Sequence, residues 1–258
     1  IVCLHGWTMR GALFDDLAAR LGPGCAVSAP DLPGHGSAPF GEPWLDRAAE
    51  TAARTIEATG RDDVLLLGWS MGAAVAWHYL DRFGADRVAG LVTVDMSPKL
   101  VNEGGWAHGL LGQEPGRIAR TTSEIHTDWT RAAEKIATTM FAEKTGAPGF
   151  SRDDALRQVL SNDPAAMARV WDAMIAMDLR AAATRVPCPW IVAHGARSRV
   201  YPAATAAWLA DSAPQARLAR FGQSGHSPQL EEPDAFARMI LDFSGELEAH
   251  PPRRARLR

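Results

Sequence analysis

The chain has 258 residues, of which 47% are hydrophobic and 22% are charged, and its formal net charge is −3. This size and balance suit one globular domain with a full apolar core. The small net charge gives no reason to expect nucleic acid or an anionic membrane as a partner, and no apolar run approaches the roughly 20 residues of a membrane span.

The three cysteines, Cys3, Cys25 and Cys188, are few, odd in number and set in or beside apolar runs. We therefore expect reduced thiols in a cytoplasmic protein, with the thiols buried as small apolar groups. The chain opens at Ile1 directly on an apolar run, without an initiator Met or a signal peptide. We expect that the recorded sequence lacks an N-terminal piece.

Short runs rich in Val, Ile, Leu and Ala recur along the chain and predict strands. The predicted strands are residues 1–4, 25–30, 64–67, 88–94, 189–193 and 216–221. The predicted helices between them are residues 10–21, 44–59, 72–83, 203–211 and 233–247. Most strand candidates are apolar throughout, as in strands buried on both faces. The alternation predicts an α/β fold with a doubly wound, mostly parallel sheet.

The sequence Gly68-Trp69-Ser70-Met71-Gly72 lies between a predicted strand and a predicted helix. A G-x-S-x-G pattern in that setting is typical of a nucleophile elbow, a strained turn that exposes a serine hydroxyl above a parallel sheet. The glycines fit the strain, because side chains two positions from the serine would collide with the neighbouring strand and helix. Ser70 is therefore the predicted nucleophile.

Residues 97–185 break the alternation of strands and helices, because they hold helical patterns and turns but no convincing strand. This stretch is too long for a loop, and we predict a helical lid inserted after the strand that follows the nucleophile helix. The core then comprises residues 1–96 and 186–248. The basic tail, residues 249–258, is expected to fray, and nothing else in the chain supports a nucleic-acid role for it.

A serine nucleophile needs a base, and the base needs an orienting acid. His226 follows the last predicted strand in a glycine-containing loop, at the edge where open α/β sheets place their sites. His5 and His194 each end a strand just before a glycine, and turn packing is the role expected for them. His226 is therefore the predicted base.

An oxyanion hole needs two backbone N–H groups directed at one point. Met71 supplies one, because it follows the nucleophile. The second is expected from the loop after the first strand, where Trp7 follows His5-Gly6. The indole of Trp7 can form an aromatic pocket wall at the same time, because the donor is its backbone.

Taken together, His5-Gly6-Trp7, the run from Asp31 to Ser37, the Ser70 elbow and Gly225-His226 resemble the α/β-hydrolase superfamily. The pieces occur in that family's order and span nearly the whole chain. The resemblance implies an α/β-hydrolase fold with a helical lid at residues 97–185. It also implies a structural turn at Asp31, to which we assign no catalytic role.

The acid departs from the pattern of that family. Members usually carry it in a His-Gly-x-x-Asp sequence after the strand that follows the lid, and here Ser198 takes its place. A neutral hydroxyl cannot stabilise an imidazolium by charge. Asp95 is the best substitute, because it ends the strand after the elbow, where some members of the superfamily carry their acid. The alternative is that Asp95 only caps the first helix of the lid; Asp211 is a poorer candidate.

Trp7 and Trp69 flank the predicted site, and such walls favour an apolar acyl or alcohol group. His-Gly-Trp combined with Gly-Trp-Ser-x-Gly is most similar to the pimeloyl-[acyl-carrier protein] methyl ester esterases of biotin synthesis. That resemblance implies a carrier-linked methyl ester as substrate and an acidic acyl-carrier protein as a possible partner of basic lid residues. The basic residues of the lid include Arg117, Arg120, Arg131, Lys135, Arg152 and Arg157. Acidic residues are interspersed with them, so a solvated mixed surface is the alternative.

Several alternatives use the same residues: a general small-ester hydrolase, a lactonase or a cofactor-free perhydrolase. A haloalkane dehalogenase or epoxide hydrolase is disfavoured, because those enzymes use Asp where this chain has Ser70. A non-catalytic hydrolase-fold binding protein is conceivable, because the usual acid is missing. No cofactor is expected, and no H-E-x-x-H or C-x-x-C pattern predicts a metal.

Overall fold

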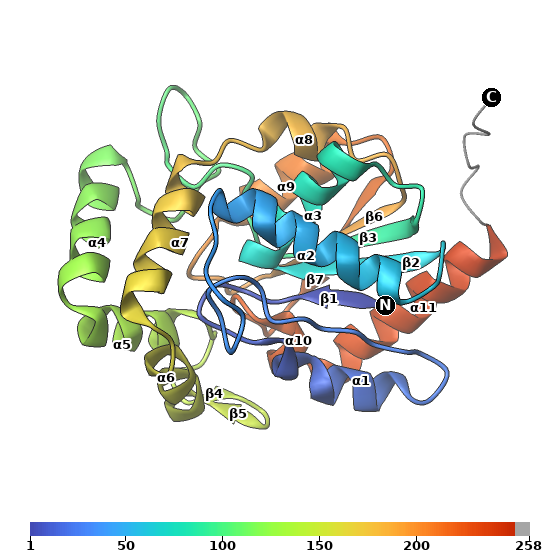
Figure 1. Cartoon of the computed structure of the whole chain (residues 1–258), viewed down its shortest axis with the longest axis horizontal. Helices are drawn as coiled ribbons and strands as arrows, with labels where there is room; N and C mark the ends of the chain where they lie inside the picture. Colours follow the sequence, from blue (N-terminus) through green and yellow to red (C-terminus); the bar gives the residue numbers. More distant parts are fainter. Residues whose placement is uncertain (251–258) are drawn as a thin grey trace.

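The computed structural model describes residues 1–250. Its main sheet has five strands in the order β1-β2-β3-β6-β7, and each neighbouring pair is parallel. The strands are β1 (Val2–Leu4), β2 (Val64–Trp69), β3 (Val88–Val94), β6 (Trp190–Gly195) and β7 (Ala216–Phe221). Because all five strands run in one direction, their carboxyl ends meet at a single edge of the sheet (Figure 1). The predicted doubly wound parallel sheet is confirmed.

Helices cover both faces of this sheet (Figure 1). One face is covered by α2 (Trp44–Ala58), α3 (Met71–Phe83), α8 (Arg180–Thr184) and α9 (Ala203–Ser212), and the other by α1 (Asp15–Leu21) and α11 (Pro233–Ala249). Strand β2 shows why both layers are needed. Val64 and Leu66 pack into the first core, whereas Leu65 and Leu67 pack into the second. A strand that is apolar on both faces is stable only between two layers.

A helical insertion separates β3 from β6, and it lies on the side of the sheet toward which β1 runs from the N-terminus (Figure 1). It contains α4 (Pro115–Thr127), α5 (Trp129–Thr139), α6 (Arg152–Leu160) and α7 (Pro164–Ala176), followed by α8. Trp129 of α5 and Trp171 of α7 contact Trp7, which follows β1. The insertion therefore packs beside the carboxyl ends of the strands.

Three expectations for individual elements are wrong. Residues 25–30 form no strand but a single parallel bridge from Ser28 to Val2, and Pro30 has no N–H with which to extend a ladder. The predicted helix 10–21 divides into a 3-10 helix η1 (Gly11–Phe14) and α1. The insertion holds a short hairpin of β4 (Gly146–Ala147) and β5 (Phe150–Ser151), whose turn residue Gly149 has φ 77°.

Two further features lie at the C-terminal end. A short helix, α10 (Pro228–Glu231), precedes α11, which continues to Ala249. Most of the predicted frayed tail, residues 251–258, lies outside the described residues. Within residues 1–250, no helix is both long and apolar enough to cross a membrane.

Candidate active site

Ser70 occupies a strained turn between β2 and α3. Its φ of 51° and ψ of −122° are unusual for a residue with a side chain. The flanking glycines permit this turn. A Cβ on Gly68 would lie 2.4 Å from the carbonyl oxygen of Gly72, and a Cβ on Gly72 would lie 2.1 Å from that of Leu4. The turn holds Ser70 half-buried at the carboxyl end of β2.

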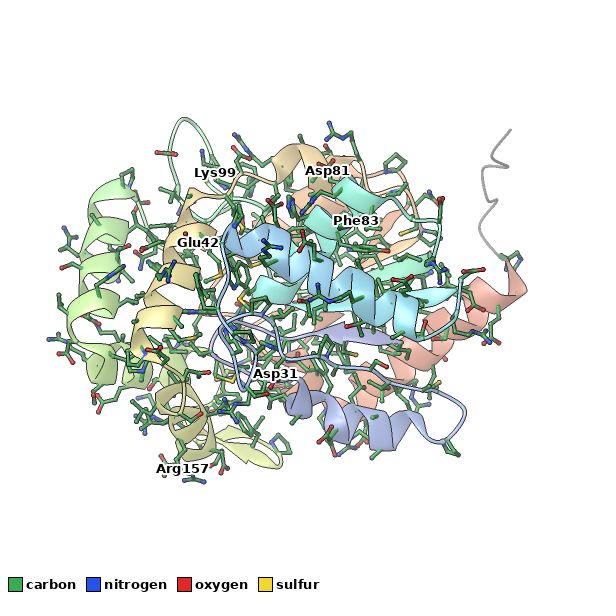
Figure 2. The ribbon with its side chains drawn as sticks, in the orientation of Figure 1. Asp31, Glu42, Asp81, Phe83, Lys99 and Arg157 are labelled. Carbon is green, nitrogen blue, oxygen red and sulfur yellow. The ribbon has the colours of Figure 1, made fainter. Side chains whose placement is uncertain are left out.

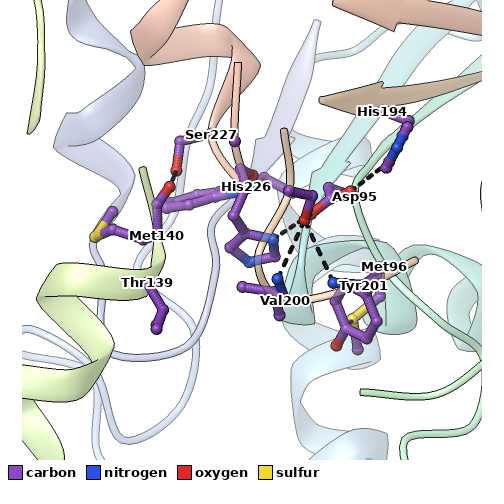
Figure 3. A network of polar contacts seen from close by, with 12 residues as sticks. Asp95, Met96, Thr139, Met140, His194, Val200, Tyr201, His226 and Ser227 are labelled. Carbon is purple, nitrogen blue, oxygen red and sulfur yellow. Dashed lines mark hydrogen bonds and ion pairs between the residues drawn. The ribbon is translucent and has the colours of Figure 1, made fainter. Parts of the chain in front are cut away.

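Asp95 and His226 meet at the same edge of the sheet (Figure 3). Asp95 follows β3, and its Oδ2 lies 2.6 Å from Nδ1 of His226. Burial of Asp95 opposes its ionisation, but hydrogen bonds from His194 and His226 outweigh that effect and hold its pKa below the usual value. Asp95 is therefore an anion beside the Nδ1 of His226, and Nε2 is the ring nitrogen that remains for another partner.

Two more donors hold the same carboxylate. Nδ1 of His194 lies 2.7 Å from Oδ1 of Asp95, and Ser198 donates its hydroxyl to Oδ2 at 2.6 Å. The expectation of simple turn packing for His194 is wrong. The register explains why: β3 and β6 pair Val94 with Ala193, so Asp95, which follows β3, lies beside His194 near the end of β6.

The loop after β1 lies against the elbow, because a Cβ on Gly6 would lie 3.4 Å from the Cβ of Ser70. This loop carries the backbone N–H of Trp7, and Met71 begins α3, where the first N–H groups have no partner in the helix. Neither N–H has an acceptor among residues 1–250. Both predicted oxyanion donors therefore have free N–H groups in segments next to Ser70.

Two buried imidazoles fix the loop after β1. Nε2 of His5 accepts the N–H of Leu32 at 2.9 Å, and Nε2 of His35 accepts the N–H of Thr8 at 3.1 Å. Burial lowers the pKa of His5 to about 4 and that of His35 to about 3. Both rings are therefore neutral, which suits their role as hydrogen-bond acceptors.

The turn at Asp31 has a structural role, as the sequence indicated. Its Oδ1 accepts the N–H of Gly11 at 2.9 Å, and a Cβ on Gly36 would collide with its carboxylate, only 1.9 Å away. Asp31 thereby ties the turn to the start of η1.

No group of three or more His, Cys, Asp or Glu side chains that could hold a metal ion occurs in the part of the chain that the structure describes.

The two tryptophans of the predicted site have different surroundings. Trp7 is partly exposed and lies 5.2 Å from the Trp171 ring, and its Nε1 donates to the Met167 carbonyl at 3.2 Å. Trp69 is only 2% exposed and donates its Nε1–H to the carbonyl of His226 at 2.8 Å. A ring buried this far offers almost no surface to a substrate, so the expectation of a Trp69 pocket wall is corrected: its indole supports the His226 loop instead.

The chain is similar to proteins of one known family. The model of the "Alpha/beta hydrolase family" matches residues 1–239. A pimeloyl-[acyl-carrier protein] methyl ester esterase of Aromatoleum aromaticum is 33% identical over 94% of this chain and 96% of its own length. A protein of the same description from Chromobacterium violaceum is 31% identical over 94% of this chain and 92% of its own.

Solved structures show the same fold. An esterase from Exiguobacterium antarcticum superposes with a TM-score of 0.86 at 20% identity, over 95% of this chain and 91% of the other. A bromoperoxidase from Bacillus anthracis superposes with a TM-score of 0.82 at 19% identity, over 94% and 90%. From the match to the family model over residues 1–239, we conclude that the chain belongs to the alpha/beta hydrolase family.

Proposed function

We propose that the protein hydrolyses carboxylic esters through an acyl-enzyme on Ser70, with His226 as base and Asp95 as the orienting acid. The observation that carries the proposal is the 2.6 Å contact between Nδ1 of His226 and the buried, ionised Asp95. A buried carboxylate that engages one imidazole nitrogen fixes the tautomer and leaves the other nitrogen to take a proton.

In the first half-reaction, Ser70 Oγ forms a bond to the ester carbonyl carbon and its proton passes to Nε2 of His226. The carbonyl electron pair moves to the oxygen, where the N–H groups of Trp7 and Met71 stabilise the negative charge. Asp95 stabilises the imidazolium without taking up its proton. The carbon–oxygen bond to the alcohol then breaks, and the alcohol oxygen receives the proton from His226.

In the second half-reaction, water attacks the acyl carbon while His226 Nε2 removes its proton. The tetrahedral oxyanion collapses, the bond to Ser70 Oγ breaks, and the serine oxygen recovers a proton from His226. The acid product leaves, and no cofactor is required by this sequence of steps.

The direct test is labelling of Ser70 by a fluorophosphonate together with turnover of a small acetate ester. We expect both in the natural chain and neither in Ser70→Ala. A chain that folds but neither labels nor turns over esters contradicts the proposal and favours the non-catalytic binding protein.

For the substrate, we propose a methyl ester of a carrier-linked acyl chain, because the relatives from Aromatoleum aromaticum and Chromobacterium violaceum are described as pimeloyl-[acyl-carrier protein] methyl ester esterases. The partly exposed Trp7 and its neighbours Trp129 and Trp171 support an apolar acyl group. A cytoplasmic location is part of this proposal, because three free cysteines suit a reducing compartment.

The charges of the insertion narrow the region that can dock an acidic carrier. Of the six basic residues named in the sequence analysis, four have acidic partners within the insertion: Arg131 and Lys135 pair with Glu124, Arg152 pairs with Asp153, and Arg157, which is labelled in Figure 2, pairs with Asp154.

By contrast, Arg117 and Arg120 on α4 are exposed, and neither forms an ion pair within residues 1–250. Unpaired arginines lose no existing partner when an acidic surface approaches. We therefore propose α4 as the helix that contacts the carrier.

The substrate proposal is tested with methyl esters of increasing acyl length, free and carrier-linked. We expect a lower KM for the carrier-linked ester than for the free ester. This difference in KM should shrink as the salt concentration rises, because surface charges are screened beyond about 10 Å at 0.1 M salt. Arg117→Glu with Arg120→Glu should remove that advantage, whereas Arg131→Glu with Lys135→Glu should remove less. Equal KM for free and carrier-linked esters at all salt concentrations would point to a general small-ester hydrolase.

A further inference from the structure

The loop that carries His226, here called the base loop (residues 222–227), has no regular secondary structure. Its backbone is held by a carboxylate instead. Glu231, the last residue of α10, accepts the N–H of Gly225 at 2.8 Å and that of Ser227 at 3.1 Å, both on Oε2. These two donors flank His226 in the chain, so one carboxylate oxygen fixes the backbone on both sides of the predicted base.

The other oxygen of Glu231 binds a different part of the molecule. Oε1 accepts the N–H of Ala142, just after α5, at 2.6 Å. Ser227 adds a second link, because its hydroxyl donates to the carbonyl of Met140 at 2.9 Å (Figure 3). The fit is close: a Cβ on Gly225 would lie 2.5 Å from the nitrogen of Ala142.

We infer that Glu231 is a positioning residue for His226. It holds the base loop against residues 140–142, which follow α5, so that the two segments keep a fixed position relative to each other. The inference deepens the proposed function and rests on it where activity is measured. Glu231 forms no hydrogen bond with Ser70 or with the imidazole of His226; it acts through the backbone on either side of His226.

The neighbouring residue provides a matched control. Glu232 accepts the N–H of Gln223 at 2.9 Å and the hydroxyl of Ser224 at 2.5 Å. It therefore holds the earlier part of the base loop, but it has no hydrogen bond to residues 140–142. Replacing either glutamate by glutamine keeps the size, removes one charge and exchanges one acceptor oxygen for an NH2 group. The two variants therefore weaken different sets of hydrogen bonds by the same chemical change.

We expect Glu231→Gln to lower kcat for a small acetate ester by about tenfold with KM within about twofold, because a misplaced base costs rate and not ground-state binding. The rate of Ser70 labelling by a fluorophosphonate should fall in parallel. Glu232→Gln should change kcat by no more than about twofold. Equal kcat in the two variants would overturn the inference.

Hydrogen exchange tests the coupling without using activity. In Glu231→Gln, peptides covering residues 140–142 and 225–227 should exchange faster together, whereas in Glu232→Gln only the peptide around residue 223 should change. Faster exchange in only one of the two segments of Glu231→Gln would overturn the coupling. If Glu231→Gln does not fold, Ser227→Ala, which removes only the link to Met140, must speed exchange at residues 140–142.

The two proposals fail in different ways. A natural chain without esterase activity or labelling contradicts the proposed function, and the exchange measurement still tests the fastening by Glu231. An active natural chain in which Glu231→Gln matches Glu232→Gln contradicts only the role of Glu231.

Discussion

His-Gly occurs twice at the carboxyl end of a parallel strand: His5-Gly6 after β1 and His194-Gly195 at the end of β6. Both imidazoles are buried, at 0% and 4% exposure. His5 is bonded to backbone groups of Gly6 and Leu32, and burial lowers its pKa to about 4. His194 instead places Nδ1 at 2.7 Å from the Asp95 carboxylate.

The same dipeptide thus serves two purposes, and the neighbouring strand decides which. Strand β1 lies at one edge of the sheet and β6 lies beside β3, which ends at Asp95. A buried imidazole whose partners are backbone groups stays neutral and structural, whereas one beside a carboxylate helps to hold that carboxylate in place. Substitutions of the Asp95 carboxylate or of the imidazoles test this difference between His5 and His194.

The largest effect is expected from Asp95→Asn. An amide keeps the shape but cannot stabilise the imidazolium by charge or fix the tautomer, so kcat for a small ester should fall by about 10³- to 10⁴-fold. Steady-state turnover measures it. The control is Ser198→Ala, which removes one donor to Oδ2 and the acceptor of the Val200 and Tyr201 N–H groups, and it should cost less than about tenfold. Near-normal turnover of Asp95→Asn would show that the acid lies elsewhere.

A second effect concerns stability and the neutral pair, His5 and His35. Their folded pKa values, about 4 and about 3, lie below the ordinary 6.5. The unfolded chain therefore binds protons below pH 6.5 that the folded chain does not. Their stabilising contribution is present above pH 6.5 and is lost as pH falls toward 3, by about 4 kcal/mol between pH 7 and 5 for the pair.

Urea unfolding at pH 7, 6 and 5 measures this loss. The variant His35→Gln keeps an acceptor for the Thr8 N–H and removes one titrating group, so its free energy of unfolding should fall less steeply with acidification than that of the natural chain. Parallel slopes for the two chains would mean that His35 is not a buried neutral group.

Much of the fold follows from sequence patterns. Uniformly apolar runs such as 64–67 and 88–94 predict central strands, and β2 and β3 occupy those positions. Residues 25–30 are also mostly apolar, but none of them is buried and only Ser28 forms a bridge. Composition does not reveal which chain lies alongside a segment, and ladder formation depends on that neighbour.

Three residues of the candidate site could be proposed from the sequence, because each of them stands in a recognisable pattern of its own. Ser70 stands in a glycine-spaced turn, and His226 and Asp95 each follow a strand; the structure brings the last two together. The roles of His194 and Glu231 could not be predicted in the same way. The role of His194 requires the β3–β6 register, and that of Glu231 requires knowing that residues 140–142 fold against the base loop. Both depend on contacts between distant parts of the chain.

A third prediction concerns a variant in which the carboxylate is transferred from position 95 to position 198. Ser198 Oγ and His226 Nδ1 each lie 2.6 Å from the same Asp95 oxygen, so a carboxylate at position 198 can take over that oxygen's place. Exchange of the two residues, Asp95→Ser with Ser198→Asp, should recover about 10- to 100-fold of the kcat lost in Asp95→Ser alone. Ser198→Asp alone should be less active than the natural chain, since two adjacent carboxylates oppose each other's ionisation. No recovery in the exchange would mean that the acid is effective only at the end of β3.

The smallest effect returns to the two His-Gly pairs. His194→Phe keeps a buried ring but leaves Oδ1 of Asp95 without its donor, so kcat should fall by about three- to tenfold with KM unchanged. His194→Asn offers an amide donor and should recover part of the loss. His5→Phe removes the acceptor of the Leu32 N–H, and its main effect should be a loss of about 1–3 kcal/mol in the free energy of unfolding. If kcat of His194→Asn is no higher than that of His194→Phe, the hydrogen bond from His194 to Asp95 does not contribute to turnover. His194 would then be only a packed ring, which is the role that the sequence alone suggests for both His-Gly pairs.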